Sequence, residues 1–130
     1  MKNKTIWSNR FKYKTSQSFQ KIGSSIHIDK RLYEQDIASS VVHTQMLVKQ
    51  KIIKSEDGNK IINGLKKIKA QIDKGNFEFK EKYEDIHLNK EKALFEIIGP
   101  SAGFLHTARS RNDQVVTDFK LWIKEASNEI

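Results

Sequence analysis

The sequence contains no cysteine, a single proline and no long apolar run. Without cysteine, the chain can form no disulfide, thiol nucleophile or thiolate metal site. Its four histidines are scattered, with no pair at the spacing of metal ligands, so we expect no metal. No stretch approaches the roughly 20 apolar residues that span a bilayer, and the lysine-bearing start leads into polar sequence. We therefore expect a cytoplasmic protein without a membrane partner.

The chain is rich in charged residues, lysine above all. Its 130 residues, 37% hydrophobic and 31% charged, are typical of one soluble globular domain. The net charge of +8 would suit nucleic acid, but the lysines are spread along the chain instead of forming one stripe. Only four of the 24 basic residues are arginines: Arg10, Arg31, Arg109 and Arg111. We interpret the charge as a solvated surface and predict no nucleic-acid partner.

Apolar residues recur at helical spacing in four regions, which predicts an all-α fold. These regions are residues 29–51, 55–75, 85–99 and 113–130. In the last one the apolar face is wide, as in a helix buried within a bundle, and the pattern is still running at Ile130 without a stop signal. The chain is therefore expected to be either a piece of a longer protein or a truncated one.

The first 28 residues show no sustained period and are rich in Ser, Thr, Asn and Lys. This composition predicts an extended arm lying over the surface. Its expected apolar anchors are Ile6, Trp7, Phe11, Tyr13 and Phe19.

A polar string lies where the Gly- and Pro-containing segment of residues 99–103 gives way to a helix. Residues 105–119 read Leu-His-Thr-Ala-Arg-Ser-Arg-Asn-Asp-Gln-Val-Val-Thr-Asp-Phe. Two arginines beside hydroxyl and amide donors at a helix start are the chemistry of a carboxylate site. The same string also satisfies the capping-box pattern, with Ser110 followed by Asp113, so residue types alone leave both interpretations open.

The order of residues 105–119 resembles the first signature region of the argininosuccinate lyase family, in the aspartase/fumarase superfamily. Residues 24–32 are similar to the family's Asn-Ala-Ser-Ile-x-x-Asp-x-Arg-Leu, with Gly23 where asparagine is usual. Residues 84–87, with Glu91, resemble the segment just upstream of the signature region. Residues 7–11 resemble Trp-Gly-Gly-Arg-Phe, but Ser8 and Asn9 replace both glycines, which puts a tight turn there in doubt.

The resemblance covers residues 7–130 and implies the N-terminal part of such a lyase. Residues 1–28 would be the arm, residues 29–111 a small helical domain with the signature loop at 99–111, and residues 112–130 the truncated first helix of a central helical bundle. The implied reaction is β-elimination of argininosuccinate to arginine and fumarate, in arginine biosynthesis. The implied assembly is a homotetramer whose active sites each draw on three subunits, and no cofactor is implied.

The resemblance also implies substrate-binding residues, by carry-over of matching positions: Ser25, His87, Arg109, Ser110, Arg111 and Asn112. Arg111 and Asn112 would hold substrate carboxylates, Ser25 and His87 would complete that contact, and the other two would shape the loop or add donors. Without the family, Ser25 is only a loop serine and His87 only a helix histidine. The family's catalytic acid and base lie in later signature regions, so we expect the 130-residue chain alone to be inactive.

Two alternatives stay open. Another lyase of the superfamily, of the adenylosuccinate lyase or aspartase type, would share much of this pattern, although the Arg-Ser-Arg-Asn-Asp string and the Trp7 arm favour argininosuccinate by resemblance. A non-catalytic relative, like the lens crystallins that resemble this lyase, or a truncated relic, would keep the motifs without the activity. Substrate binding would separate an enzyme from such a relative.

Overall fold

The computed structural model describes residues 16–130, and within that range the chain is helical with no strand. The all-α prediction is therefore confirmed. Within the same range, no helix is long and apolar enough to cross a membrane. In chain order the elements are α1 (Gln17–Gly23), α2 (Ile26–Asp29), the 3-10 turn η1 (Lys30–Leu32), α3 (Tyr33–Lys49), α4 (Ser55–Asp73), the 3-10 turn η2 (Glu81–Tyr83), α5 (Ile86–Ile98), the 3-10 segment η3 (Gly99–His106) and α6 (Arg111–Asn128).

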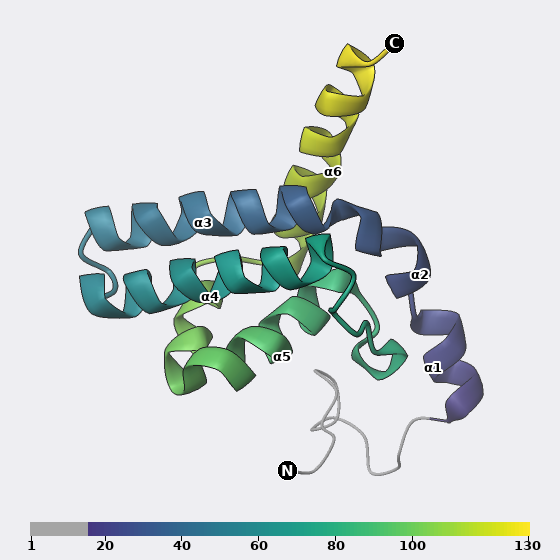
Figure 1. Ribbon diagram of the computed structural model, residues 1–130, viewed down its shortest axis with the longest axis horizontal. Helices are drawn as coiled ribbons and strands as arrows, with labels where there is room; N and C mark the ends of the chain where they lie inside the picture. The colour runs from purple at the N-terminus through teal and green to yellow at the C-terminus, as the bar shows by residue number, and fades with distance from the viewer. Residues whose placement is uncertain (1–15) are drawn as a thin grey trace.

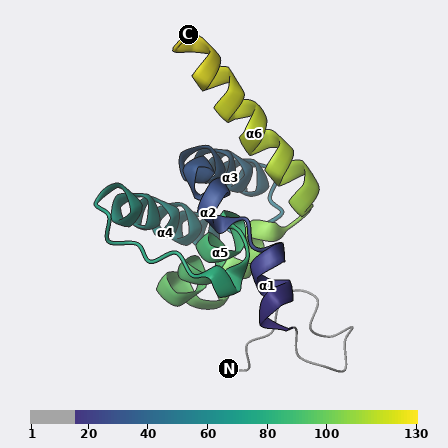
Figure 2. The same ribbon diagram turned by 90° about the vertical axis from the view of Figure 1, so that its right-hand side faces the viewer.

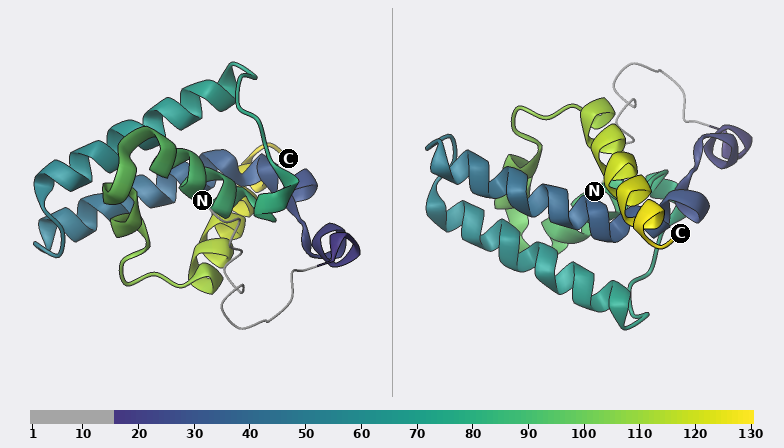
Figure 3. Two further views of the ribbon diagram at one scale, coloured as in Figure 1. Left: turned by 90° about the horizontal axis from the view of Figure 1, so that it is seen from below. Right: turned by 90° about the horizontal axis from the view of Figure 1, so that it is seen from above.

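Helices α3 and α4 lie side by side and antiparallel, and α5 packs against α4 (Figures 1 and 3). The segment η3 folds back over α5 and α4 before the chain enters α6. Between these helices lies an apolar core to which α3, α4, α5 and η3 all contribute. Its buried members are Ile37, Leu47, Ile53, Ile61, Leu65, Ile68, Leu94, Ala102 and Leu105.

Helices α4 and α5 begin and end where the sequence predicts. Helix α4 starts at Ser55 with two acids in its first turn, where the helix dipole favours negative charge. Helix α5 starts after Asp85, whose side chain accepts a hydrogen bond from the Leu88 N–H at 2.7 Å. The helix ends at Gly99, whose φ of 71° is a value that glycine adopts without strain, and Pro100 follows.

The arm prediction is wrong for part of residues 16–28. Residues Gln17–Gly23 form α1, and the Ser16 side chain caps it by accepting a hydrogen bond from the Phe19 N–H at 3.2 Å. Seven residues make too few turns for a helical period to appear in the sequence. The helix predicted over residues 29–51 is likewise divided, because the chain passes through η1 before α3 begins. The anchors Ile6, Trp7, Phe11 and Tyr13 lie outside the described residues, as does the Trp7 motif.

Helix α6 crosses the N-terminal half of α3, and its C-terminal end extends away from the other helices (Figures 1 and 2). Its fully buried side chains are polar, namely Gln114 and Asp118. Much of the apolar stripe predicted for a bundle helix is exposed instead, including Val116 at 52% and Phe119 at 51%. The described residues therefore cover the polar face of α6 and leave most of its apolar face open.

Close approach of α4 and α5 depends on Gly64. A Cβ atom at this position would lie 2.5 Å from Leu94 Cδ1 and 3.1 Å from Ile98 Cγ2. We predict that Gly64→Ala lowers the free energy of unfolding by about 1–2 kcal/mol, because overpacking outweighs the gain in helix propensity. Urea denaturation followed by circular dichroism measures it. The control is Gly103→Ala, whose Cβ would meet nothing within 4 Å; equal losses in the two variants would contradict the packing argument.

Candidate functional site

The start of α5 is tied to the segment that carries Ser25. Glu84 has a φ of 64°, and its carbonyl accepts hydrogen bonds from the N–H groups of Ser25 at 2.8 Å and Ile26 at 3.0 Å. The Ser25 hydroxyl donates to Asp29 Oδ2 at 2.6 Å, and the Ile86 N–H donates to Asp29 Oδ1 at 3.1 Å. Asp29 thus joins the two segments, and its burial raises the pKa of its carboxyl above the ordinary value.

His87 lies in the first turn of α5 and is buried. Its Nε2 is 2.9 Å from Asp118 Oδ2 on α6, and its Nδ1 is 3.8 Å from Asp85 Oδ2. Burial alone would lower the pKa of His87, but the carboxylates of Asp118, Asp85 and Asp36 raise it to about 9. At neutral pH the ring is therefore an imidazolium that donates to Asp118, and it joins α5 to α6.

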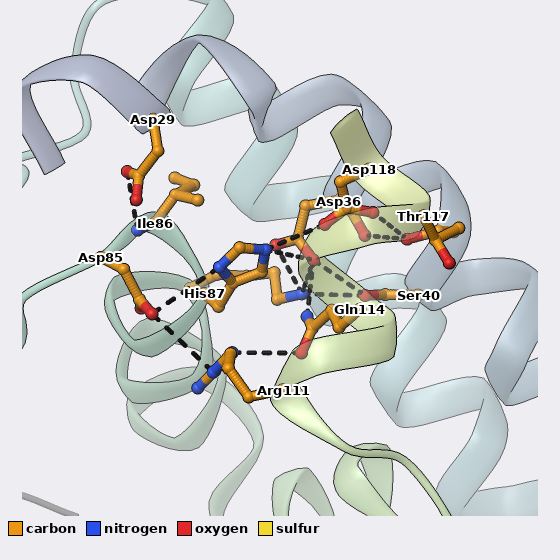
Figure 4. A network of polar contacts seen from close by, with 12 residues as sticks. Asp29, Asp36, Ser40, Asp85, Ile86, His87, Arg111, Gln114, Thr117 and Asp118 are labelled. Atoms are coloured by element: carbon orange, nitrogen blue, oxygen red, sulfur yellow. Dashed lines mark hydrogen bonds and ion pairs between the residues drawn. The ribbon is translucent and has the colours of Figure 1, made fainter. Parts of the chain in front are cut away.

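Arg111 is the first residue of α6 and faces the start of α5 (Figure 4). Its Nη1 donates to Gln114 Oε1 at 3.1 Å and lies 3.3 Å from Glu91 Oε1. Its Nε is 3.8 Å from Asp85 Oδ2, the same oxygen that approaches His87. The guanidinium therefore faces two carboxylates and an amide oxygen, in a position that is partly open to solvent.

Arg109 lies on the other side of the signature loop and contacts α3. Its Nη1 donates to Ser40 Oγ and its Nη2 to Ser39 Oγ, both at 3.1 Å. The preceding residue, Ala108, has a φ of 55°, a left-handed conformation that costs a non-glycine residue about 1 kcal/mol. The strained turn at Ala108 reverses the chain so that Arg109 reaches α3.

Ser110 and Asn112 are exposed at the start of α6. The Ser110 hydroxyl accepts a hydrogen bond from the Asn112 N–H at 3.2 Å, and Asp113 Oδ1 accepts one from the Ser110 N–H at 2.7 Å. This reciprocal pair forms the capping box that the sequence also allowed. Of the six predicted residues, Ser25, His87 and Arg111 gather around the start of α5, while Arg109, Ser110 and Asn112 flank them along the signature loop.

A buried polar network lies behind these residues, between α3, α5 and α6 (Figure 4). Lys90 is 1% exposed, and its Nζ lies 2.7 Å from Asp36 Oδ1 and 2.6 Å from Oδ2. The same ammonium donates to Ser40 Oγ at 2.8 Å, and Gln114 Nε2 donates to Asp36 Oδ1 at 2.7 Å. Burial alone would raise the pKa of the Asp36 carboxyl, but the Lys90 and His87 cations hold it below its ordinary value.

Three donors of this network have the composition of a metal site. Asp36, His87 and Asp118 each offer one ligand atom, and these three atoms lie within 4.8 Å of one another. However, the Lys90 ammonium already lies against both oxygens of Asp36. A metal ion would have to share that carboxylate with an ammonium group at ion-pair distance, so the arrangement fits an internal ion-pair network better than a metal centre.

Sequence reasoning missed most of this network. Asp36, Ser40, Lys90, Gln114 and Asp118 carry polar side chains at buried positions, where a hydrophobic pattern gives no signal. Spacing was the available clue: Asp36 and Ser40, and likewise Gln114 and Asp118, are four residues apart on one helix. Each pair therefore lies on one helix face, next to residues that the apolar period assigns to the core.

The comparison with protein families identifies the class of the chain. A family model described as lyase matches residues 9–130. Because this match covers nearly the whole sequence, the chain belongs to this lyase family.

Curated relatives carry a more specific name. Proteins named argininosuccinate lyase from Pelagibacter ubique, Ehrlichia canis and Symbiobacterium thermophilum are 56%, 53% and 51% identical to this chain over 98%, 97% and 92% of its length. The matched segment is 28%, 26% and 26% of those proteins, so the chain spans little more than a quarter of their length. The resemblance drawn from the signature region is confirmed.

We predict that the stability of the chain falls as pH rises through the range in which His87 loses its proton. The folded-state pKa of His87, about 9, is above its ordinary value of 6.5. Because the folded state holds this proton more tightly than the unfolded state, the proton stabilises the fold by about 3 kcal/mol at most. This stabilisation is complete below about pH 6.5 and is lost as the pH rises past about 9. Urea denaturation across this range measures the slope. In His87→Gln, whose amide donates to Asp118 without titrating, that slope should flatten; an unchanged slope would contradict the assignment.

Lys90→Met should destabilise the fold far more than the same substitution at an exposed lysine. It leaves the Asp36 carboxylate buried without its ammonium partner, a loss that typically costs about 3–5 kcal/mol. The matched control is Lys60→Met on α4, which removes an exposed pair with Glu56 and should leave the unfolding free energy nearly unchanged. Thermal and urea unfolding of both variants provide the comparison, and similar losses would rule out a special role for the buried pair.

Proposed function

We propose that this chain forms the N-terminal part of an argininosuccinate lyase, a cytoplasmic enzyme of arginine biosynthesis that releases fumarate and arginine by β-elimination. The observation that carries the proposal is the name shared by relatives that are 51–56% identical over nearly the whole chain. The grouping of Ser25, His87 and Arg111 around the start of α5 supports it, because these are residues for which the signature motifs predict substrate contact.

In this proposal the chain binds and orients the substrate. Argininosuccinate carries carboxylates, and the planar fork of Arg111 suits bidentate binding of one of them. Asn112 would add an amide donor from the exposed start of α6. The Ser25 hydroxyl, which donates to Asp29, and the buried His87 ring, which faces Asp118 and Asp85, would complete the contact by exchanging these internal partners for the substrate. Arg109 and Ser110 would hold the loop in shape or add further donors. The groups that move the proton would come from later parts of the enzyme.

The surroundings of Arg111 suggest how a substrate carboxylate would enter. The guanidinium lies 3.3 Å from Glu91 Oε1 and 3.8 Å from Asp85 Oδ2. The incoming carboxylate would therefore replace or join these internal acids. Where the substrate displaces one of these acids, Arg111 keeps an anionic partner but the displaced carboxylate loses its ion pair, so a net gain requires better hydrogen-bond geometry with the substrate.

The proposed assembly is a homotetramer in which each active site uses several subunits. Within it, residues 29–111 would form the small helical domain with the signature loop, and residues 112–130 the first part of a central bundle helix. The exposed apolar side chains of α6, such as Val116 and Phe119, support this arrangement, because a helix in a bundle buries such a face.

A chimera tests the proposed function. Residues 9–130 of this chain would replace the matching segment of the Pelagibacter ubique argininosuccinate lyase. We expect the chimera to release fumarate from argininosuccinate, measured by ultraviolet absorbance, and the 130-residue chain alone to release none. Arg111→Lys in the chimera should lower kcat/KM by about 100-fold or more, since lysine cannot bind a carboxylate bidentately.

The unmodified relative is the control for assembly and turnover. A chimera that assembles as the relative does but leaves argininosuccinate intact would refute the proposal. Preferential turnover of adenylosuccinate or aspartate would replace it with the corresponding lyase of the same superfamily.

A further inference from the structure

The Lys90–Asp36 pair is an unusual feature that the proposed chemistry does not use. Both side chains are essentially inaccessible to solvent, and lysine is rarely buried to this degree. Removing two charges from water costs several kcal/mol per ion, and a buried pair is often no more stabilising than apolar side chains of the same volume. Its connections to neighbouring side chains are therefore more informative than its contribution to stability.

One connection runs from Asp36 through Gln114 to Arg111. Gln114 is buried, its Nε2 donates to Asp36 Oδ1 at 2.7 Å, and its Oε1 accepts from Arg111 Nη1 at 3.1 Å. The reverse orientation of the amide would place Oε1 against a carboxylate and Nε2 against a guanidinium, two contacts of like polarity. The negative charge of Asp36 therefore fixes which end of the amide faces Arg111.

A second connection runs from Asp36 through Ser40 to Arg109. The Ser40 oxygen accepts from Lys90 Nζ at 2.8 Å and from Arg109 Nη1 at 3.1 Å. Both partners are cations that can only donate, so the hydroxyl proton must turn elsewhere. Asp36 Oδ1 lies 3.5 Å away, at the outer limit of a hydrogen bond, and is an acceptor toward which that proton can turn. The Lys90 ammonium, itself held by Asp36, occupies one lone pair of Ser40 and leaves the other for Arg109.

We propose that Asp36 is a positioning residue for the signature loop: by fixing which atoms of Gln114 and Ser40 face outward, it orients the two arginines of that loop. Lys90 supplies the cation that allows Asp36 to remain charged inside the protein. As a role in substrate binding, this inference rests on the proposed function, but the orientation of the arginines can be measured without any substrate.

The test is side-chain NMR of the 130-residue chain. It contains four arginines, so single Arg→Lys variants assign their Nε–H signals. In Gln114→Met, the order parameter of Arg111 Nε should fall from about 0.8 to below about 0.6, whereas that of Arg109 should hold. In Ser40→Ala the pattern should be reversed. Gln71→Met, at an exposed position on α4, is the matched control and should change neither signal.

A second variant tests whether the buried Asp36–Lys90 charges set the orientation of the two arginines. Asp36→Leu/Lys90→Met removes both buried charges at similar volume, an exchange that folded proteins usually tolerate. Backbone amide spectra verify that the variant is folded, and both arginines should then become mobile although Gln114 and Ser40 are intact. Ordered arginines in this folded variant would overturn the proposal, as would equal loosening of both arginines in each single variant.

Kinetics of the chimera separate positioning from folding and from the proposed function. Gln114→Met should raise KM for argininosuccinate about tenfold or more with a smaller change in kcat, because a loosened Arg111 binds the substrate and the transition state equally poorly. An unchanged KM would contradict the role in substrate binding. If the chimera has no activity while the NMR pattern appears, the proposed function fails and the positioning of the arginines stands.

Discussion

The ion pair between Lys90 and Asp36 connects three helices at the point where the candidate site is built. Asp36 comes from α3, Lys90 from α5, and the amide of Gln114 reaches the same carboxylate from α6. An uncompensated charge in this interior would cost several kcal/mol. The three helices are therefore constrained to meet in an arrangement that pairs the Asp36 carboxylate with Lys90 and Gln114. The relative position of the signature loop and the start of α5 follows from this constraint.

The buried cluster also balances its own charge. His87 and Lys90 are cations, Asp36 and Asp118 are anions, and all four are buried. These acids are therefore neutralised by groups inside the network, and the signature arginines are left at its edge. Arg109 contacts hydroxyls, whereas Arg111 meets the more accessible acids Asp85 and Glu91. Charge is thus arranged in two layers, an interior whose charges cancel and a rim where, in the proposed function, a substrate carboxylate would contact Arg111.

The sequence was informative where a single local signal decides the structure. Helix α5 was predicted at both ends because Asp85 caps its start and Gly99 ends it, and each acts through its own backbone or side chain. The network was invisible because Asp36 and Lys90 are 54 residues apart and their residue types are those of a protein surface. Only the tertiary fold, in which α3 and α5 both pack against α4, brings them together. Ser110 shows an intermediate case, since its capping box is visible in the sequence pattern, whereas its place beside the candidate site was predicted only through the family resemblance.

Helix α6 docks on the rest of the described chain by polar contacts instead of an apolar face. Gln114 bonds Asp36, Asp118 bonds Ser39 and His87, and Glu125 accepts from Gln35. These directional contacts fix the register of the helix but bury little apolar area. Val116 and Phe119 stay exposed, so the free energy that their burial would provide is not gained within the described chain. In the proposed assembly those side chains would pack in a bundle. Since the first turn of the same helix carries Arg111 and Gln114, packing of its apolar face in that proposed assembly would add to the polar contacts that already hold these residues in place.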